Sequence, residues 1–155
     1  MNNFDIDTVM TELEKHFKSV RTPIVDQIQI QTKDPFKVLV TTILSARTKD
    51  ETTSQAARKL FDKVRNIDDL EKISAEELDS IIYPVGFHNA KTKYLKQLPS
   101  VLKEKFGGNI PSEIDELLQL PGVGRKTANL VRAIAFSLPA ICVDVHVHRI
   151  CNRWG

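Results

Sequence analysis

The chain has 155 residues, of which 41% are hydrophobic and 27% charged, a composition typical of a folded globular domain rather than a disordered segment. It contains no apolar run of about 18 residues, which a membrane-spanning helix would need, and no secretory signal at its N-terminus. Its net charge of +2 does not identify a binding partner, and its two cysteines indicate a reducing, cytoplasmic setting without a disulfide framework.

Helical spacing of apolar residues organises the start of the chain. Residues 7–20 carry apolar side chains three and four positions apart, which predicts a first helix. Residues 28–31 alternate apolar and polar side chains and are a candidate for a short extended stretch. The Asp-Pro pair at 34–35 is a typical helix start, and the apolar segment 36–46 that follows predicts a central, buried helix.

Four later segments also predict helices, and each has a boundary signal. No segment shows the alternation of a β-hairpin, so the predicted fold class is all-α. The four segments are 50–64 with Asp50 as a candidate cap, 74–82 opened by a capping box at Ser74, 89–106 ended by Gly107 and Gly108, and 113–119 capped by Ser112.

Basic residues gather in two stretches. Two interpretations are open: a nucleic-acid-binding patch, or two solvated helix faces, which charge alone favours. The first stretch contains Lys91, Lys93, Lys96, Lys103 and Lys105, and the second contains Arg125, Lys126 and Arg132.

The segment 117–128, Leu-Leu-Gln-Leu-Pro-Gly-Val-Gly-Arg-Lys-Thr-Ala, is the most specific in the chain. Pro121 cannot continue a preceding helix, and Gly122 and Gly124 leave the backbone uncovered by side chains. Because a new helix begins at once, its first N–H groups and the positive end of its dipole form a site for a phosphate oxygen. An ordinary tight turn between helices is the alternative interpretation.

This string resembles the helix-hairpin-helix motif of the endonuclease III family of DNA glycosylase/AP lyases. Three other segments resemble motifs of that family in the same order, and the resemblance extends over residues 36–153. They are Leu-Ser-Ala-Arg-Thr-Lys-Asp at 44–50, Val-Gly-Phe-His-Asn-Ala-Lys at 85–91, and Val-Asp-Val-His-Val-His-Arg at 143–149.

The resemblance implies a helix-hairpin-helix glycosylase fold. We therefore expect a six-helix barrel domain at 22–137, with the hairpin motif at about 113–137. Residues 1–21 and 138–155 are expected to form part of a second helical domain, truncated before the iron–sulfur segment. The implied setting is cytoplasmic and nucleoid-associated, with a full-length protein that is a monomer.

Lys126 and Asp144 are the candidate catalytic residues. An amine near a helix N-terminus is favoured in its neutral, nucleophilic form. A helix from Arg125 to Ser137 rises roughly 18 Å, and the six residues 138–143 can span about 20 Å back, so Asp144 can return beside Lys126. A solvated lysine and an aspartate that only caps a helix are the alternatives, and the resemblance implies the reactive roles.

The resemblance also implies which residues contact DNA. Arg47 and Phe87 match the two positions that insert into the duplex when a nucleotide is flipped out, although a surface arginine and a core phenylalanine are the alternatives. Arg47 replaces the commoner glutamine of the family. The hairpin residues Gly122, Val123, Gly124 and Arg125, together with His146, complete the predicted DNA contacts.

We expect no metal in this chain. The side chains of Cys142, His146, His148 and Cys151 do not have a usual zinc-ligand spacing. The family's 4Fe-4S cluster is held by four cysteines spaced C-x₆-C-x₂-C-x₅-C, which this sequence lacks. A fragment is favoured over a cluster-less variant, and the apolar face of the first helix is then expected to be exposed.

The predicted function is a DNA glycosylase with AP lyase activity in base excision repair. Its expected partner is double-stranded DNA with a damaged or mismatched base, a pyrimidine by preference, or an abasic site. The alternatives are a non-catalytic helix-hairpin-helix DNA-binding module, an inactive fragment of such a glycosylase, and an adenine-specific or other branch of the superfamily. Lys126 argues against branches that lack an amine nucleophile.

Overall fold

The computed structural model describes residues 5–20 and 22–154, which form α-helices and connecting turns and contain no strand. This agrees with the all-α prediction. The helices are α1 (Ile6–Phe17), α2 (Ile24–Thr32), α3 (Pro35–Ser45), α4 (Asp50–Lys63), α5 (Ile67–Lys72), α6 (Ala75–Ile82), α7 (His88–Phe106), α8 (Ile114–Leu117), α9 (Arg125–Phe136) and α10 (Val145–Trp154).

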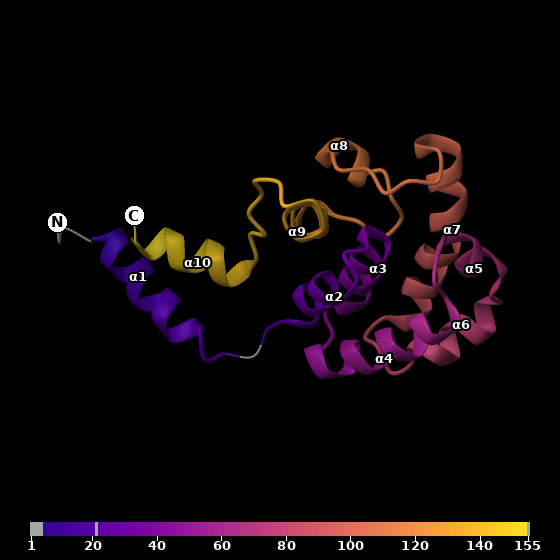
Figure 1. Ribbon diagram of the computed structural model, residues 1–155, viewed down its shortest axis with the longest axis horizontal. Coiled ribbons are helices and arrows are strands. Elements are labelled where there is room, and N and C mark those ends of the chain that lie inside the picture. The colour runs from indigo at the N-terminus through magenta and orange to yellow at the C-terminus, as the bar shows by residue number, and fades with distance from the viewer. Residues whose placement is uncertain (1–4, 21, 155) are drawn as a thin grey trace. The chain divides into compact units, whose positions relative to one another are not determined.

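The chain divides into two units, residues 24–142 and residues 1–23 with 143–155. The larger unit is built around α3, which packs against α2, α4, α7 and α9 (Figure 1). Eight of the eleven residues of α3 are buried, and Val38, Leu39, Val40 and Leu44 are fully enclosed. The central buried helix predicted at 36–46 is therefore confirmed.

Local signals place several helix boundaries as predicted. The Asp34 carboxylate accepts a hydrogen bond from the Phe36 N–H at 2.9 Å at the start of α3. The Ser74 hydroxyl accepts one from the Glu77 N–H at 3.1 Å at the start of α6. Gly107, with φ of 60°, ends α7 in the left-handed conformation that glycine adopts without strain.

Two segments differ from the predictions. Residues 28–31 are helical in α2, because Ile24, Val25 and Ile28 lie on one face against Val38. The short helix α5 was not predicted.

Two predicted caps are also wrong. Asp50 is the first residue of α4 rather than its cap, and its carboxylate accepts from the Ile24 N–H at 3.1 and 3.2 Å. It therefore fixes the start of α2 instead. Helix α8 begins at Ile114 after Glu113, and the Ser112 carbonyl accepts a hydrogen bond from Arg132. At Asp50 a tertiary hydrogen bond takes the carboxylate that the sequence prediction assigned to a local cap.

The smaller unit contains α1 and α10, and neither helix has a buried residue. The apolar residues Ile6, Met10, Leu13 and Phe17 of α1 are 45%, 55%, 38% and 58% exposed. The prediction of an exposed apolar face on the first helix is confirmed. None of the described helices has both the length and the apolar character needed to cross a membrane.

Candidate functional site

The hairpin between α8 and α9 is anchored in the core by its apolar residues. Leu120 and Val123 are 3% and 8% exposed, and the Val123 N–H donates to the Leu120 carbonyl at 3.2 Å. Gly122 has a φ of 75°, and a Cβ atom there would lie 2.7 Å from the Tyr94 ring. Only glycine fits this position, because the turn is left-handed and the ring of α7 packs against it.

The first turn of α9 is open to an anion. Gly124 is its N-cap residue and contributes no side chain, and its carbonyl accepts the first helical hydrogen bond, from Ala128, at 2.8 Å. The N–H groups that precede Ala128 in the helix have no partner within it. Arg125 and Lys126 are both exposed in this turn, so the turn presents backbone donors and two cationic side chains together.

Lys126 lines a cavity of about 210 Å³ between the first turn of α9 and the C-terminal end of α3. The hydroxyls of Thr42 and Ser45 in its wall donate to carbonyls of their own helix at 2.8 and 2.9 Å. The cavity also contains Arg47, so the structure brings this predicted DNA contact and the predicted nucleophile into one pocket. The remaining lining residues are Ala46, Thr127 and Leu130.

Arg47 and Phe87 lie beside each other, although 40 residues separate them in the sequence. The Arg47 guanidinium is 5.3 Å from the centre of the Phe87 ring, within the range of a cation–π interaction. Phe87 is 63% exposed, so it is not the core residue that was the alternative interpretation. With Ala46, Ala90, Lys91 and Tyr94 the pair lines a second cavity, of about 230 Å³.

Asp144 and His146 lie in the smaller unit, at the start of α10. The Asp144 carboxylate accepts hydrogen bonds from the N–H groups of His146 and Val147, both at 2.9 Å, and so caps this helix. The His146 side chain is exposed, and its Nδ1 lies 3.4 Å from an Arg149 guanidinium nitrogen. The pairing of Asp144 with Lys126 stays a prediction, because the two residues belong to different units.

Sequence reasoning missed Lys91. It was grouped with the basic residues of a solvated helix face, yet its side chain is only 5% exposed. Burial lowers the pKa of its ammonium group from 10.5 to about 8. Its position within the motif at 85–91 was the available signal of a special role, whereas its charge predicted an exposed side chain.

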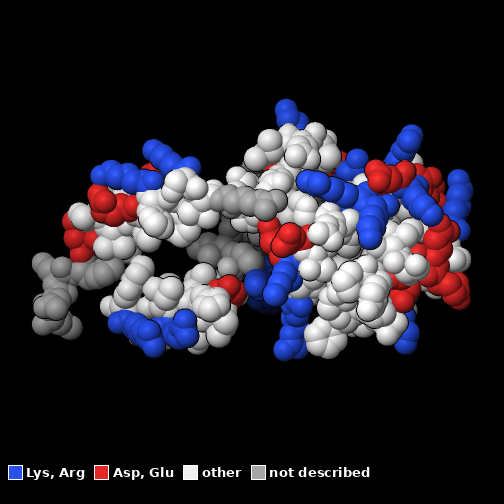
Figure 2. Space-filling model, turned by 90° about the horizontal axis from the view of Figure 1, so that it is seen from below, with Lys and Arg blue, Asp and Glu red and all other residues white. Residues whose placement is uncertain are grey.

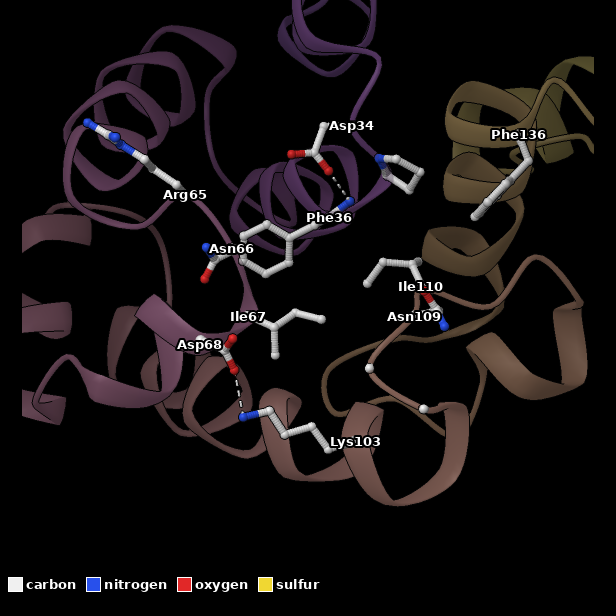
Figure 3. Close-up of a pocket in the computed structure, with 13 residues that line it drawn as sticks. Asp34, Phe36, Arg65, Asn66, Ile67, Asp68, Lys103, Asn109, Ile110 and Phe136 are labelled. Atoms are coloured by element: carbon white, nitrogen blue, oxygen red, sulfur yellow. Dashed lines mark hydrogen bonds and ion pairs between the residues drawn. The ribbon is translucent and has the colours of Figure 1, made fainter.

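Another cavity, of about 740 Å³, lies at the opposite end of α3 (Figure 3). Three of its charged side chains are engaged in structural contacts: Asp34 caps α3, and Asp68 accepts from Lys103 at 2.7 Å. The Arg65 side chain points away from the cavity in Figure 3. Since α3 is about 16 Å long, this cavity is distant from Lys126 and from the pair formed by Arg47 and Phe87.

Surface charge does not mark a site by itself. On the face seen in Figure 2, lysine and arginine side chains of the larger unit are interspersed with aspartate and glutamate. Lys103 is bound to Asp68 and Glu71, which removes it from any free basic patch.

The residues present do not fit the 4Fe-4S cluster that the family resemblance implies. Among the described residues, no group of three or more histidine, cysteine, aspartate or glutamate side chains could hold a metal ion. Cys142 lies 3.7 Å from the Lys126 carbonyl oxygen, to which its thiol donates, and Cys151 is exposed. No chemical step is therefore assigned to a cluster.

Comparison with protein families gives one match that covers most of the chain. Residues 40–155 match the model of the HhH-GPD superfamily of base excision DNA repair proteins. Endonuclease III of Thermotoga maritima is 48% identical over 122 residues, which are 79% of this chain and 57% of that protein. Endonuclease III of Bacillus subtilis is 38% identical over 129 residues, which are 83% and 59%. The chain thus spans little more than half of either relative.

Solved structures give the same fold. A non-covalent complex of endonuclease III with DNA superposes with a TM-score of 0.81 at 35% identity, covering 94% of this chain and 65% of that one. A thermostable thymine-DNA glycosylase superposes with a TM-score of 0.83 at 28% identity, covering 94% and 66%. Both likenesses include the hairpin and the helices around α3, since they extend over nearly all of the chain.

Proposed function

Because the chain belongs to the HhH-GPD superfamily of base excision DNA repair proteins, we propose that it is a DNA glycosylase with AP lyase activity. Its substrate is duplex DNA with a damaged or mismatched base, a pyrimidine by preference, or an abasic site. In this proposal the domain predicted at 22–137 holds the nucleophile, and the segments 1–21 and 138–155 supply the partner carboxylate.

The position of Lys126 is the observation that carries the proposal. This lysine lines a cavity directly after a hairpin whose open backbone donors suit a phosphate. A duplex bound by that hairpin presents a sugar next to the phosphate it holds, within reach of a flexible lysine side chain. The thiol of Cys142, two residues before Asp144, donates to the Lys126 carbonyl, which supports the return of the chain to this lysine.

The proposed reaction begins with attack of the neutral Lys126 amine on C1′ of the sugar. The N-glycosidic bond breaks and its electron pair leaves with the base, which is protonated as it departs. Asp144 stabilises the positive charge that develops on the sugar and takes the proton lost by the amine. Opening of the sugar ring leaves a Schiff base between Nζ and C1′.

Strand cleavage follows from the Schiff base. Removal of a C2′ proton sends an electron pair into the C2′–C3′ bond, and the 3′ phosphate leaves by β-elimination. Hydrolysis then returns the lysine. An amine nucleophile is essential to this sequence, because water attacking in its place would give base removal without the covalent intermediate.

DNA binding is divided among the other predicted residues. Gly122, Val123, Gly124 and Arg125 hold a phosphate without reading sequence, which suits a protein that must search all of the DNA. Phe87 and Arg47 enter the gap left by the flipped nucleotide. His146 is proposed as a further contact to the backbone.

Borohydride trapping tests the proposal. The parent chain is incubated with a duplex containing one abasic site, and the reductant converts a Schiff base into a stable covalent adduct. We expect the adduct from the parent and none from Lys126→Ala, which should still bind the duplex. Arg125→Ala is the matched control, since it removes the neighbouring cation: it is expected to weaken binding and still form the adduct at saturating DNA.

The alternatives give different results in the same experiment. Duplex binding without an adduct from the parent would indicate a non-catalytic helix-hairpin-helix module or an inactive fragment. An adduct that persists in Lys126→Ala would assign the nucleophile to another amine. Either result would contradict the proposed role of Lys126.

A further inference from the structure

The buried ammonium group of Lys91 binds the segment that follows α3. Its Nζ donates to the carbonyl oxygens of Leu44 and Ala46 at 2.7 and 2.6 Å and to the Thr48 hydroxyl at 3.2 Å. A lysine ammonium has three donors, so all three are satisfied by two backbone carbonyls and one hydroxyl at the end of α3 and directly after it. No hydrogen bond or ion pair of the described residues joins Lys91 to a carboxylate, and its polar partners are Leu44, Ala46 and Thr48.

The same network reaches the turn between α6 and α7. The Thr48 hydroxyl accepts from the Gly86 N–H at 3.1 Å. A Cβ atom on Gly86 would lie 2.5 Å from the Arg47 carbonyl oxygen, which shows how closely the two loops approach. Thr48 therefore joins the loop after α3 to the loop before α7, and its hydroxyl also accepts a hydrogen bond from Lys91.

Each of these loops contains a residue with unfavourable backbone geometry. Arg47 and Phe87 have φ values of 52° and 58°, in the left-handed region that residues with side chains seldom adopt. Such conformations persist only where the surrounding contacts impose them. The hydrogen bonds of Thr48 to Lys91 and Gly86 join both loops, and the exposed guanidinium and ring lie directly beside these contacts.

We propose that Lys91 is a positioning residue, which locks the two loops together and so presents Arg47 and Phe87 as one preformed wedge. The inference rests on the proposed function, in which this pair fills the duplex when a nucleotide is flipped out. Lys91 itself touches neither the substrate nor the reacting atoms. Its effect reaches the reaction only through the placement of the wedge.

Lys96 provides a matched control on the same helix. Its Nζ donates to the carbonyl oxygens of Leu70, Glu71 and Ile73 at 3.2, 2.8 and 2.6 Å, at the C-terminal end of α5. The chemistry is the same as that of Lys91: one lysine of α7 satisfies the last carbonyls of another helix. No residue of the wedge takes part, so Lys96→Met removes equivalent hydrogen bonds without affecting the loops of Arg47 and Phe87.

Amide hydrogen exchange of the free protein tests the lock without requiring activity. In Lys91→Met, the amides of Thr48, Gly86 and His88 are expected to exchange at least about tenfold faster than in the parent. In Lys96→Met, the acceleration should be confined to the amides near the end of α5, such as that of Ile73. Unchanged exchange at Gly86 and His88 in Lys91→Met would overturn the proposal, because the two loops would then be independent of the lysine.

Trapping on two substrates tests the effect on the reaction. A duplex abasic site must be extruded from the helix, whereas a single-stranded site needs no wedge. Lys91→Met is expected to lower the trapping rate roughly 10- to 100-fold on the duplex, with little change on the single strand. Lys96→Met should leave the ratio of the two rates as it is in the parent.

The outcomes separate the two proposals. If Lys91→Met lowers the trapping rate equally on the duplex and on the single strand, Lys91 has a general structural role and the inference is overturned. If the parent forms no adduct on either substrate, the proposed function fails, while hydrogen exchange still decides whether Lys91 locks the loops.

A second variant covers the case in which Lys91→Met does not fold. Thr48→Val keeps the shape of the side chain and removes its bonds to Lys91, Gly86 and Ala46. It is expected to lower the trapping rate selectively on the duplex, as Lys91→Met does, but to a smaller extent. An unchanged ratio of duplex to single-strand rates in a folded Thr48→Val protein would also count against the lock.

Discussion

Helices α3 and α1 have 11 and 12 residues, and both carry apolar side chains at helical spacing, but their environments are opposite. In α3 eight residues are buried between four other helices, whereas in α1 none is buried. An apolar stripe therefore predicts that a helix forms a packing face, and the number of helices that meet that face decides how much of it is buried. The unit of residues 24–142 supplies enough helices for a core, and the described part of the other unit does not.

The two units also differ in what they contribute to the proposed chemistry. Lys126 lies in the unit with the core, which fixes its helix against α3. Asp144 lies in the other unit, none of whose described residues is buried, and its carboxylate caps α10. A carboxylate that caps a helix can also react, but only a substitution that separates the two roles can distinguish them.

The largest effect is expected from Asp144→Asn. Asparagine is as good an N-cap as aspartate, so α10 should remain intact, while the negative charge is lost. We expect the trapping rate on duplex abasic DNA to fall by about 10²- to 10⁴-fold, the usual contribution of a catalytic acid or base. The measurement is single-turnover trapping with enzyme in excess, beside a thermal melt.

Asp144→Ala is the matched control, because it loses both the charge and the cap. Its melting behaviour should show an additional loss of about 1 kcal/mol in the free energy of unfolding. A trapping rate in Asp144→Asn equal to that of the parent would mean that the Asp144 carboxylate only caps α10. The group that takes the proton from Lys126 would then have to lie in the larger unit, as Lys126 does.

A smaller effect, on stability, compares the packing of the two helices directly. Leu39→Ala in α3 removes a side chain with no exposed surface and is expected to lower the free energy of unfolding by about 2–5 kcal/mol. Leu13→Ala in α1 removes one that is 38% exposed, and the loss should stay within about 0.5 kcal/mol. Urea unfolding of both variants measures the difference.

Protein concentration decides how the Leu13 result is interpreted. A large loss that grows with concentration would indicate that α1 buries its apolar face by association in solution. The apolar faces of α1 and α3 would then differ less in burial in solution than they do in the single chain.

The sequence predicted those parts of the molecule that depend on local signals. Helix α3 follows from an Asp-Pro start and a run of apolar residues, and the turn at Gly122 follows from the need for a positive φ. Helix α5 was missed because its six residues contain one buried side chain, Leu70, and so show no periodicity. Its position is set by packing against α7.

In the candidate site, too, the residues within local motifs were predicted and those defined by tertiary contacts were not. Lys126 and the hairpin could be picked out from a contiguous motif, and two separate motifs implied that Arg47 and Phe87 contact DNA, but that these two side chains lie together is seen only in the structure. Lys91 and Lys96 could not be told apart from the exposed lysines around them, since the carbonyls that they bind lie 20 or more residues away. Burial of a charge is a tertiary property, and local composition predicts the opposite.

A further effect on stability is expected from Lys91, whose pKa is lowered by burial to about 8. In the unfolded chain this group titrates near 10.5, so between pH 8 and pH 10.5 the unfolded state binds more protons than the folded state. Stability from this group is therefore present above pH 10.5 and is lost as the pH falls through 8, where the folded protein must bury a charged ammonium.

The free energy of unfolding of the parent, relative to Lys91→Met, is expected to rise by about 2–3 kcal/mol over this interval. Denaturant unfolding at pH 7.5, 9 and 10.5 measures it, and the subtraction cancels groups common to both proteins. A difference that stays constant with pH would mean that water reaches the Lys91 ammonium, and the enclosure that distinguishes this end of α3 from the open surface of α1 would be incomplete.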